Sequence, residues 1–71
     1  MNVNPWEVVA MVANQKAVSL RAEAAAWRSE REIQRGAAAA CVAWAGELEV
    51  LAERLDTFAD TARATVERGK A

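Results

Sequence analysis

The sequence predicts an all-α fold, an antiparallel two-helix hairpin with helices at about residues 5–35 and 37–68. Two observations lead to this prediction. Residues 5–35 contain no glycine, and no proline after Pro5, and they are rich in Ala, Glu and Arg, which favour helix. Residues 37–68 carry apolar residues at heptad spacing, typical of a helix that packs along another helix. We expect self-association or a partner protein to complete this single hairpin domain to a helical bundle.

The start of the first helix is marked by Asn4 and Pro5. Asparagine caps helix N-termini, and proline is favoured at the first helical position. Glu7 adds a negative charge near the positive end of the helix dipole. At the other end, Gly36 follows Arg35, the arrangement expected where a helix ends. We therefore expect the first helix to end at Arg35 and the chain to turn at Gly36.

The second helix carries two apolar stripes that match the first helix when the chain folds back at Gly36. The stripes are Ala37, Trp44, Leu51, Phe58 and Thr65, and Cys41, Leu48, Leu55 and Ala62. Facing residues then have numbers with a nearly constant sum: Trp27 with Trp44 and Leu20 with Leu51 add to 71, and Ala24 with Leu48 adds to 72. The expected hairpin core comprises Trp6, Leu20, Trp27, Trp44, Leu48, Leu51, Leu55 and Phe58.

The position of the turn has two alternatives. The chain could break at Trp44-Ala45-Gly46, with Glu47 opening a shorter second helix. It could also continue as one long helix in a bundle of several chains, because the alanines after Gly36 propagate a helix.

The first helix has a second apolar face, opposite the one that faces the second helix. Its residues are Val8, Met11, Val12, Val18, Ala22, Ala26 and Ile33. Helix propensity does not explain the β-branched side chains among them. Because one partner helix covers only one face, we expect this second face to be an interface with another copy of the chain or with a different protein.

Residues that carry chemistry are scarce. Histidine and tyrosine are absent, which removes histidine-based nucleophile activation, metal ligation and proton transfer near neutral pH. We expect neither an enzyme nor a site for a metal or cofactor. The single cysteine, Cys41, cannot form an internal disulfide; it falls on the core stripe opposite Arg31. It is expected to be a half-buried apolar residue, with an intermolecular disulfide as the alternative.

The charges indicate internal pairing. The net charge is −1, so nucleic acid is not an expected partner. Arg21, Arg28, Arg31 and Arg35 lie along one edge of the first helix. We expect pairing of Arg21 or Arg28 with Glu47, Glu49 or Glu53 on the second helix.

No targeting or membrane segment is evident from the sequence. The longest apolar stretch, residues 36–46, is too short to span a bilayer, and no cleavable signal is visible at the N-terminus. The expected location is cytoplasmic or virion-associated, with export without a cleaved signal as the alternative.

Trp44-Ala45-Gly46, followed by a helix with regularly spaced leucines and alanines, resembles the small helical hairpins with a Trp-x-Gly turn that type VII secretion exports. The resemblance covers these three residues and, loosely, residues 48–67. It implies a secreted, helical, dimeric partner protein.

The leading functional hypothesis is a non-enzymatic assembly subunit of bacterial or phage origin. In this hypothesis the hairpin oligomerises, or docks into a larger complex, through the second apolar face of the first helix. One alternative is a monomeric adaptor or a phage-type inhibitor that binds one host protein through the same face. The other is the exported hairpin implied by the resemblance.

Overall fold

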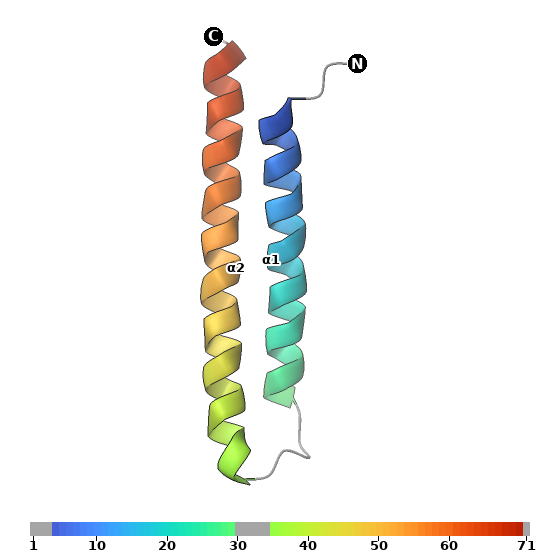
Figure 1. Cartoon of the computed structure of the whole chain (residues 1–71), viewed down its shortest axis with the longest axis vertical. Coiled ribbons are helices and arrows are strands. Elements are labelled where there is room, and N and C mark those ends of the chain that lie inside the picture. Colours follow the sequence, from blue (N-terminus) through green and yellow to red (C-terminus); the bar gives the residue numbers. More distant parts are fainter. Residues whose placement is uncertain (1–3, 30–34, 71) are drawn as a thin grey trace.

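The computed structural model consists of two α-helices that pack side by side in opposite directions (Figure 1). The structure describes residues 4–29 and 35–70, in which α1 spans Pro5–Ser29 and α2 spans Arg35–Lys70. These ranges contain no strand. The molecule measures 55 by 20 by 11 Å along its principal axes, so it is a single layer of two helices. The predicted all-α hairpin is confirmed.

Asn4 caps α1 as the sequence predicts. Its side-chain Oδ1 accepts a hydrogen bond from the backbone N–H of Trp6 at 2.9 Å, and its carbonyl accepts one from the N–H of Glu7 at 3.0 Å. These bonds satisfy N–H groups that have no partner inside the helix. Pro5 is the first residue of α1, where its missing N–H costs nothing.

The predicted turn at Gly36 is wrong, as are both alternatives. Arg35 is the first residue of α2 and not the last of α1, and α2 continues through Gly36 and Gly46. A glycine that ends a helix usually adopts a positive φ, and no glycine in the described ranges does so. The alanines that follow Gly36 favour helix strongly enough to include it in the first turn of α2. The connection between the helices falls within residues 30–34, outside the described residues.

The core between the helices is a seam of small side chains. We call its buried residues the alanine seam: Ala10, Ala13, Ala17, Leu20 and Ala24 of α1, and Ala45, Leu48, Ala52, Ala59, Ala62 and Val66 of α2. Leu20 and Ala24, both predicted to face the second helix, lie in this seam, whereas Trp6 and Trp27 of the predicted core are partly exposed rather than buried. On α2, the predicted stripe through Leu48, Leu55 and Ala62 also lies at the seam, with Leu55 half-buried.

The other predicted core stripe of α2 is wrong by one residue. Trp44, Leu51 and Phe58 are 47%, 43% and 50% exposed, and the residues that follow each of them, all alanines, are fully buried. With the corrected stripe, facing seam residues such as Leu20 with Ala52 and Ala24 with Leu48 have numbers that all add to 72. Both stripes then follow one register.

Side-chain size explains this correction. Small side chains on both helices let the backbones approach closely, which increases dispersion contact along the whole seam. Placing Trp44, Leu51 and Phe58 between the helices would hold the helix axes apart and leave voids beside the alanines of α1. The large side chains therefore lie beside the seam rather than in it.

Candidate protein-interaction surface

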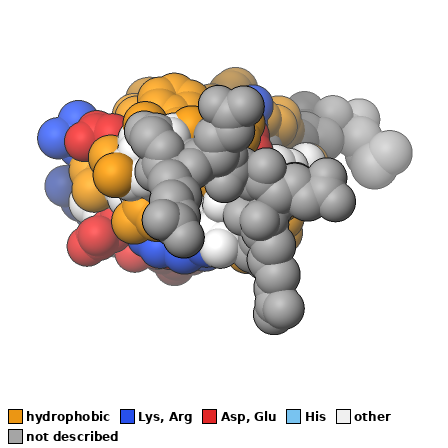
Figure 2. All heavy atoms as spheres, turned by 90° about the horizontal axis from the view of Figure 1, so that it is seen from below, with side chains coloured by type: hydrophobic (Ala, Val, Ile, Leu, Met, Phe, Trp, Pro, Cys, Tyr) orange, Lys and Arg blue, Asp and Glu red, His pale blue; other side chains and the backbone are white. Residues whose placement is uncertain are grey.

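The two broad faces of the hairpin differ in chemistry. On α2, Glu49, Asp56 and Arg63 each follow a seam residue, whereas Trp44, Leu51 and Phe58 each precede one. The helix period therefore puts these two stripes on opposite sides of the seam. In the end-on view of Figure 2, hydrophobic side chains gather along the upper side of the molecule and charged ones along the left and lower sides.

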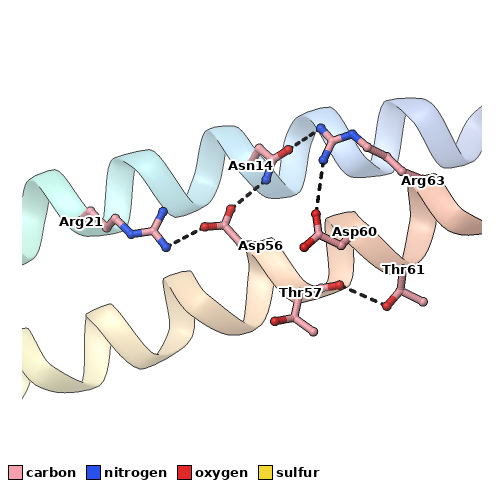
Figure 3. Close-up of polar contacts among 7 residues, drawn as sticks. All are labelled: Asn14, Arg21, Asp56, Thr57, Asp60, Thr61 and Arg63. Atoms are coloured by element: carbon pink, nitrogen blue, oxygen red, sulfur yellow. Dashed lines mark hydrogen bonds and ion pairs between the residues drawn. The ribbon is translucent and has the colours of Figure 1, made fainter.

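On one side of the seam, polar side chains pair across the helices. We call this the polar face: Asn14, Arg21 and Arg28 of α1 with Glu49, Asp56 and Arg63 of α2. Arg28 Nη2 lies 2.5 Å from Glu49 Oε1, and Arg21 Nη2 lies 2.6 Å from Asp56 Oδ2. Asn14 donates to Asp56 Oδ1 at 2.7 Å and accepts from Arg63 (Figure 3). The pairs Arg28–Glu49, Arg21–Asp56 and Asn14–Arg63 all have numbers that add to 77, so they repeat once per heptad.

Asp56 accepts hydrogen bonds from two side chains of α1, Asn14 and Arg21. The hydrogen bond from Arg21, followed by the one from Asn14, lowers the pKa of its carboxyl group, because both favour the ionised form. About a third to a half of each side chain in the Arg21–Asp56 and Arg28–Glu49 pairs remains accessible to solvent. Such exposed pairs contribute little stability each, so the polar face determines register more than it determines stability.

The expected cross-helix pairing is partly confirmed. Arg28 pairs with Glu49, as predicted, whereas Arg21 pairs with Asp56, an aspartate that the sequence analysis did not consider. The side chains of Arg31 and Arg35 lie outside those that the structure describes.

On the other side of the seam, large hydrophobic side chains from both helices are exposed or half-buried. We call this the apolar face: Val8, Val9, Val12, Trp44, Leu51, Leu55 and Phe58. At the end where the chain termini lie, a surface hollow of about 380 Å³ is lined by Val8, Val9, Val12, Ala13, Lys16, Leu55 and Phe58. Leu55 forms part of its wall and also packs against the alanine seam. The apolar face is therefore continuous with the core.

The residues of the predicted interface on the first helix do not all lie on one face of the hairpin. All its described members, Val8, Met11, Val12, Val18, Ala22 and Ala26, are exposed, and Ile33 lies outside the described residues. Val8 and Val12 line the hollow of the apolar face. Met11 and Val18 each precede a polar-face residue by one helical turn, so they border the polar face instead.

Sequence analysis missed the apolar face because it assigned Trp44, Leu51 and Phe58 to the core. A signal that could have found it was present. When Ala45, Ala52 and Ala59 face α1, the polar residues of the two helices come opposite each other and can pair. These pairs are Arg28 with Glu49, Arg21 with Asp56, and Asn14 with Arg63. The large side chains suggested that the stripe through Trp44, Leu51 and Phe58 is buried. The charges indicated instead that the alanines that follow these residues are buried.

Cys41 is half-buried on the same stripe as Leu48, in agreement with its expected place; Arg31, its expected neighbour, is not described. Within the described ranges, no group of three or more His, Cys, Asp or Glu side chains could hold a metal ion. Neither helix, over its described length, is apolar enough to cross a membrane.

In comparisons with known proteins, no family model, no curated protein and no solved structure matches this chain. What the chain does therefore has to be inferred from its own geometry.

Proposed function

We propose that this chain is a non-enzymatic assembly subunit whose exposed hydrophobic side chains are covered by helices of other chains. One observation carries the proposal: the hairpin buries small residues and exposes large ones. The buried hydrophobic residues of the described chain are eight alanines, two leucines and one valine. Two of the tryptophans are nearly half exposed, and Phe58 is 50% exposed.

The size of the chain strengthens this argument. A domain of 71 residues is near the limit at which one core stabilises a fold. Here that core is a single seam of mostly alanine side chains, each of which removes little apolar area from water. Covering the apolar face would add the burial of Trp44, Leu51 and Phe58, each of which is now close to half exposed.

Helix propensity also supports contact with other chains. Val8, Val12, Val18, Val42 and Val50 occupy exposed helical positions, where valine is a poorer helix former than alanine, lysine or glutamate. Exposed positions are usually filled by strong helix formers, since packing does not decide there. Valine at these places gains stability only when another surface packs against it.

The same residues argue against catalysis. The chain has no histidine or tyrosine, and the hollow of the apolar face is lined by hydrophobic side chains together with Lys16. This lining provides no pair of groups that could exchange a proton near neutral pH.

Association is tested on the purified chain by light scattering and thermal unfolding over about a hundredfold range of concentration. We expect a dimer or larger species and a Tm that rises with concentration, because association stabilises the folded state by mass action. Phe58→Asp should abolish association while helix content is retained at low concentration. Thr57→Asp, at the adjacent exposed position on the outer side of α2, is the matched control and should still associate.

The assembly function would be overturned by a chain that stays monomeric at every concentration and unfolds cooperatively at a constant Tm. Such a hairpin would be stable with its large hydrophobic side chains in water.

A further inference from the structure

Resting on the proposed function, we propose that the apolar face is covered by a second copy of this chain in antiparallel orientation. In this dimer the connected end of one hairpin lies over the free end of the other, and α2 packs along α2 of its partner. The result is a four-helix bundle with a two-fold axis near Leu51. Three observations support it: the charges beside the face, the spacing of its large side chains, and its area.

Four charged side chains lie at the helical positions that flank the apolar face between Trp44 and Phe58, and none has an ion-pair partner among the described residues. They are Lys16 and Glu23 of α1, and Glu47 and Arg54 of α2, all exposed. The polar face differs, because Arg21, Arg28, Glu49 and Asp56 are all paired within the hairpin. The charges that the hairpin leaves unpaired on this side remain available to another chain.

These four charges are segregated along the hairpin. Lys16 lines the same hollow as Phe58, and the register places Glu23 one heptad nearer the connected end. The order from the connected end is therefore Glu47, Glu23, Arg54, Lys16. One half of the border is acidic, and the half nearer the chain termini is basic.

Charge segregation selects the orientation of the second copy. If two hairpins stacked with their connected ends together, acidic groups would face acidic groups and basic groups would face basic ones. With the ends reversed, the acidic half of each copy lies over the basic half of the other. Electrostatic complementarity of this kind suppresses the wrong arrangement of an interface.

The large apolar side chains have the same symmetry. Trp44 and Phe58 lie seven residues before and after Leu51. Reversing a second α2 about Leu51 places Trp44 against Phe58 of the partner subunit, twice, and places Leu51 against its own copy. Glu47 and Arg54, four residues before and three after Leu51, are brought level by the same operation. One axis therefore satisfies both the hydrophobic pattern and the charge pattern.

The area of the face is sufficient for a stable dimer. Leu51 lies close to the midpoint of α2, Arg35–Lys70, so a two-fold axis there makes the two copies overlap along their full length. The broad side of the layer measures 55 by 20 Å. Covering most of it buries on the order of 800 Å² per chain, the size of a standard protein–protein interface.

The orientation is measured directly with a spin label. In a Cys41→Ala background, Ala64→Cys places one label on the exposed outer side of α2, far from Leu51. The antiparallel dimer predicts a label-to-label distance of about 40 Å at 1.5 Å per residue. Copies with their connected ends together would put the labels at the same height on opposite edges of a layer 20 Å wide, roughly 25 Å apart and well short of the antiparallel distance.

Reversing charges tests whether attraction between Glu47 and Arg54 of the two copies favours the antiparallel orientation. Glu47→Arg should raise the Kd of the dimer about tenfold, because two symmetry-related attractions become repulsions. Adding Arg54→Glu to the same chain restores opposite charges across the axis and should recover most of the affinity. Glu53→Arg, an exposed glutamate on the outer side of α2, makes the same charge change away from the face and should leave the Kd unchanged.

The outcomes separate this proposal from the assembly function. A short label distance, a tighter dimer with Glu47→Arg, or failure of the double variant to recover affinity would overturn the antiparallel dimer and leave assembly intact. The antiparallel dimer would also be overturned, with assembly intact, if the chain formed a species larger than a dimer and Leu51→Glu did not change the size of that species. A chain that is monomeric throughout would overturn both.

Discussion

At the scale of single residues, the packing of this hairpin is decided by alanine. Ala17, Ala24, Ala45, Ala52 and Ala59 are fully buried. Each contributes little hydrophobic burial, but the absence of side-chain bulk allows many backbone and Cβ contacts along the seam. The phase of the α2 heptad therefore follows the smallest side chains and not the largest ones.

Enlarging a seam alanine should be costly. Ala52→Leu inserts three heavy atoms where the helices meet, and we expect a loss of about 1–3 kcal/mol in the free energy of unfolding. Ala64→Leu makes the same change at an exposed position of α2 and should stay within about 0.5 kcal/mol of the parent chain. Urea denaturation of both variants measures the difference. A gain in stability for Ala52→Leu would contradict the alanine seam.

Asp56 should make the hairpin sensitive to acid. Its pKa is lowered in the folded chain, chiefly by the hydrogen bond from Arg21. The ionised carboxylate therefore stabilises the fold above the unfolded-state pKa of about 3.9, and this stabilisation is lost as the pH falls through the folded-state value. Asp56→Asn should be less stable than the parent chain near neutral pH, with the difference shrinking in acid.

Unfolding of the parent chain and of Asp56→Asn from about pH 7 to pH 2 tests this expectation. The control is Asp60→Asn, because the Asp60 carboxylate contacts Arg63 of its own helix at 3.9 Å. A stability difference for Asp56→Asn that stays constant down to low pH would contradict the role of the ionised carboxylate.

At the scale of the helices, the signals at the ends of α1 and α2 differ in strength. The Asn4 cap acts through local hydrogen bonds, so its position follows directly from the sequence. Glycine acts differently, because it ends a helix only where the following chain leaves the helical path. Gly36 and Gly46 lie among alanines and other helix formers, and α2 runs through both.

Gly46 should accordingly be replaceable. A Cβ built at this position meets no atom within 4 Å, and the glycine lies within a regular helix. Gly46→Ala should stabilise the hairpin by about 1 kcal/mol, equivalent to a rise in Tm of roughly 4–8 °C for a domain of this size. Gly69→Ala also meets open space but lies next to the last residue of α2, where helices are least stable, so its gain should be smaller. Destabilisation by Gly46→Ala would indicate that residues 44–46 form a turn.

At the scale of the whole molecule, the hairpin is one layer with two unlike sides. The polar face is satisfied by pairs within the chain, and the apolar face has no partner among the described residues. Because each helix has only one neighbour, the described hairpin buries leucine and valine side chains at its seam but leaves Trp44 and Phe58 about half exposed. The polar face is therefore paired within the chain, and the proposed contact between chains uses the apolar face.

The sequence by itself determined the all-α class, the N-terminal cap, the α1 stripe and the heptad spacing of α2, because these depend on local propensity and on helix periodicity. Tertiary structure alone decided which phase of the α2 heptad is buried, since that choice depends on how closely two helices can approach. Glu49 was anticipated as a partner of the arginines, whereas Asp56 emerged only with the corrected phase. The same shift of one residue moved Trp44, Leu51 and Phe58 from the expected core to the surface, where they form part of the apolar face.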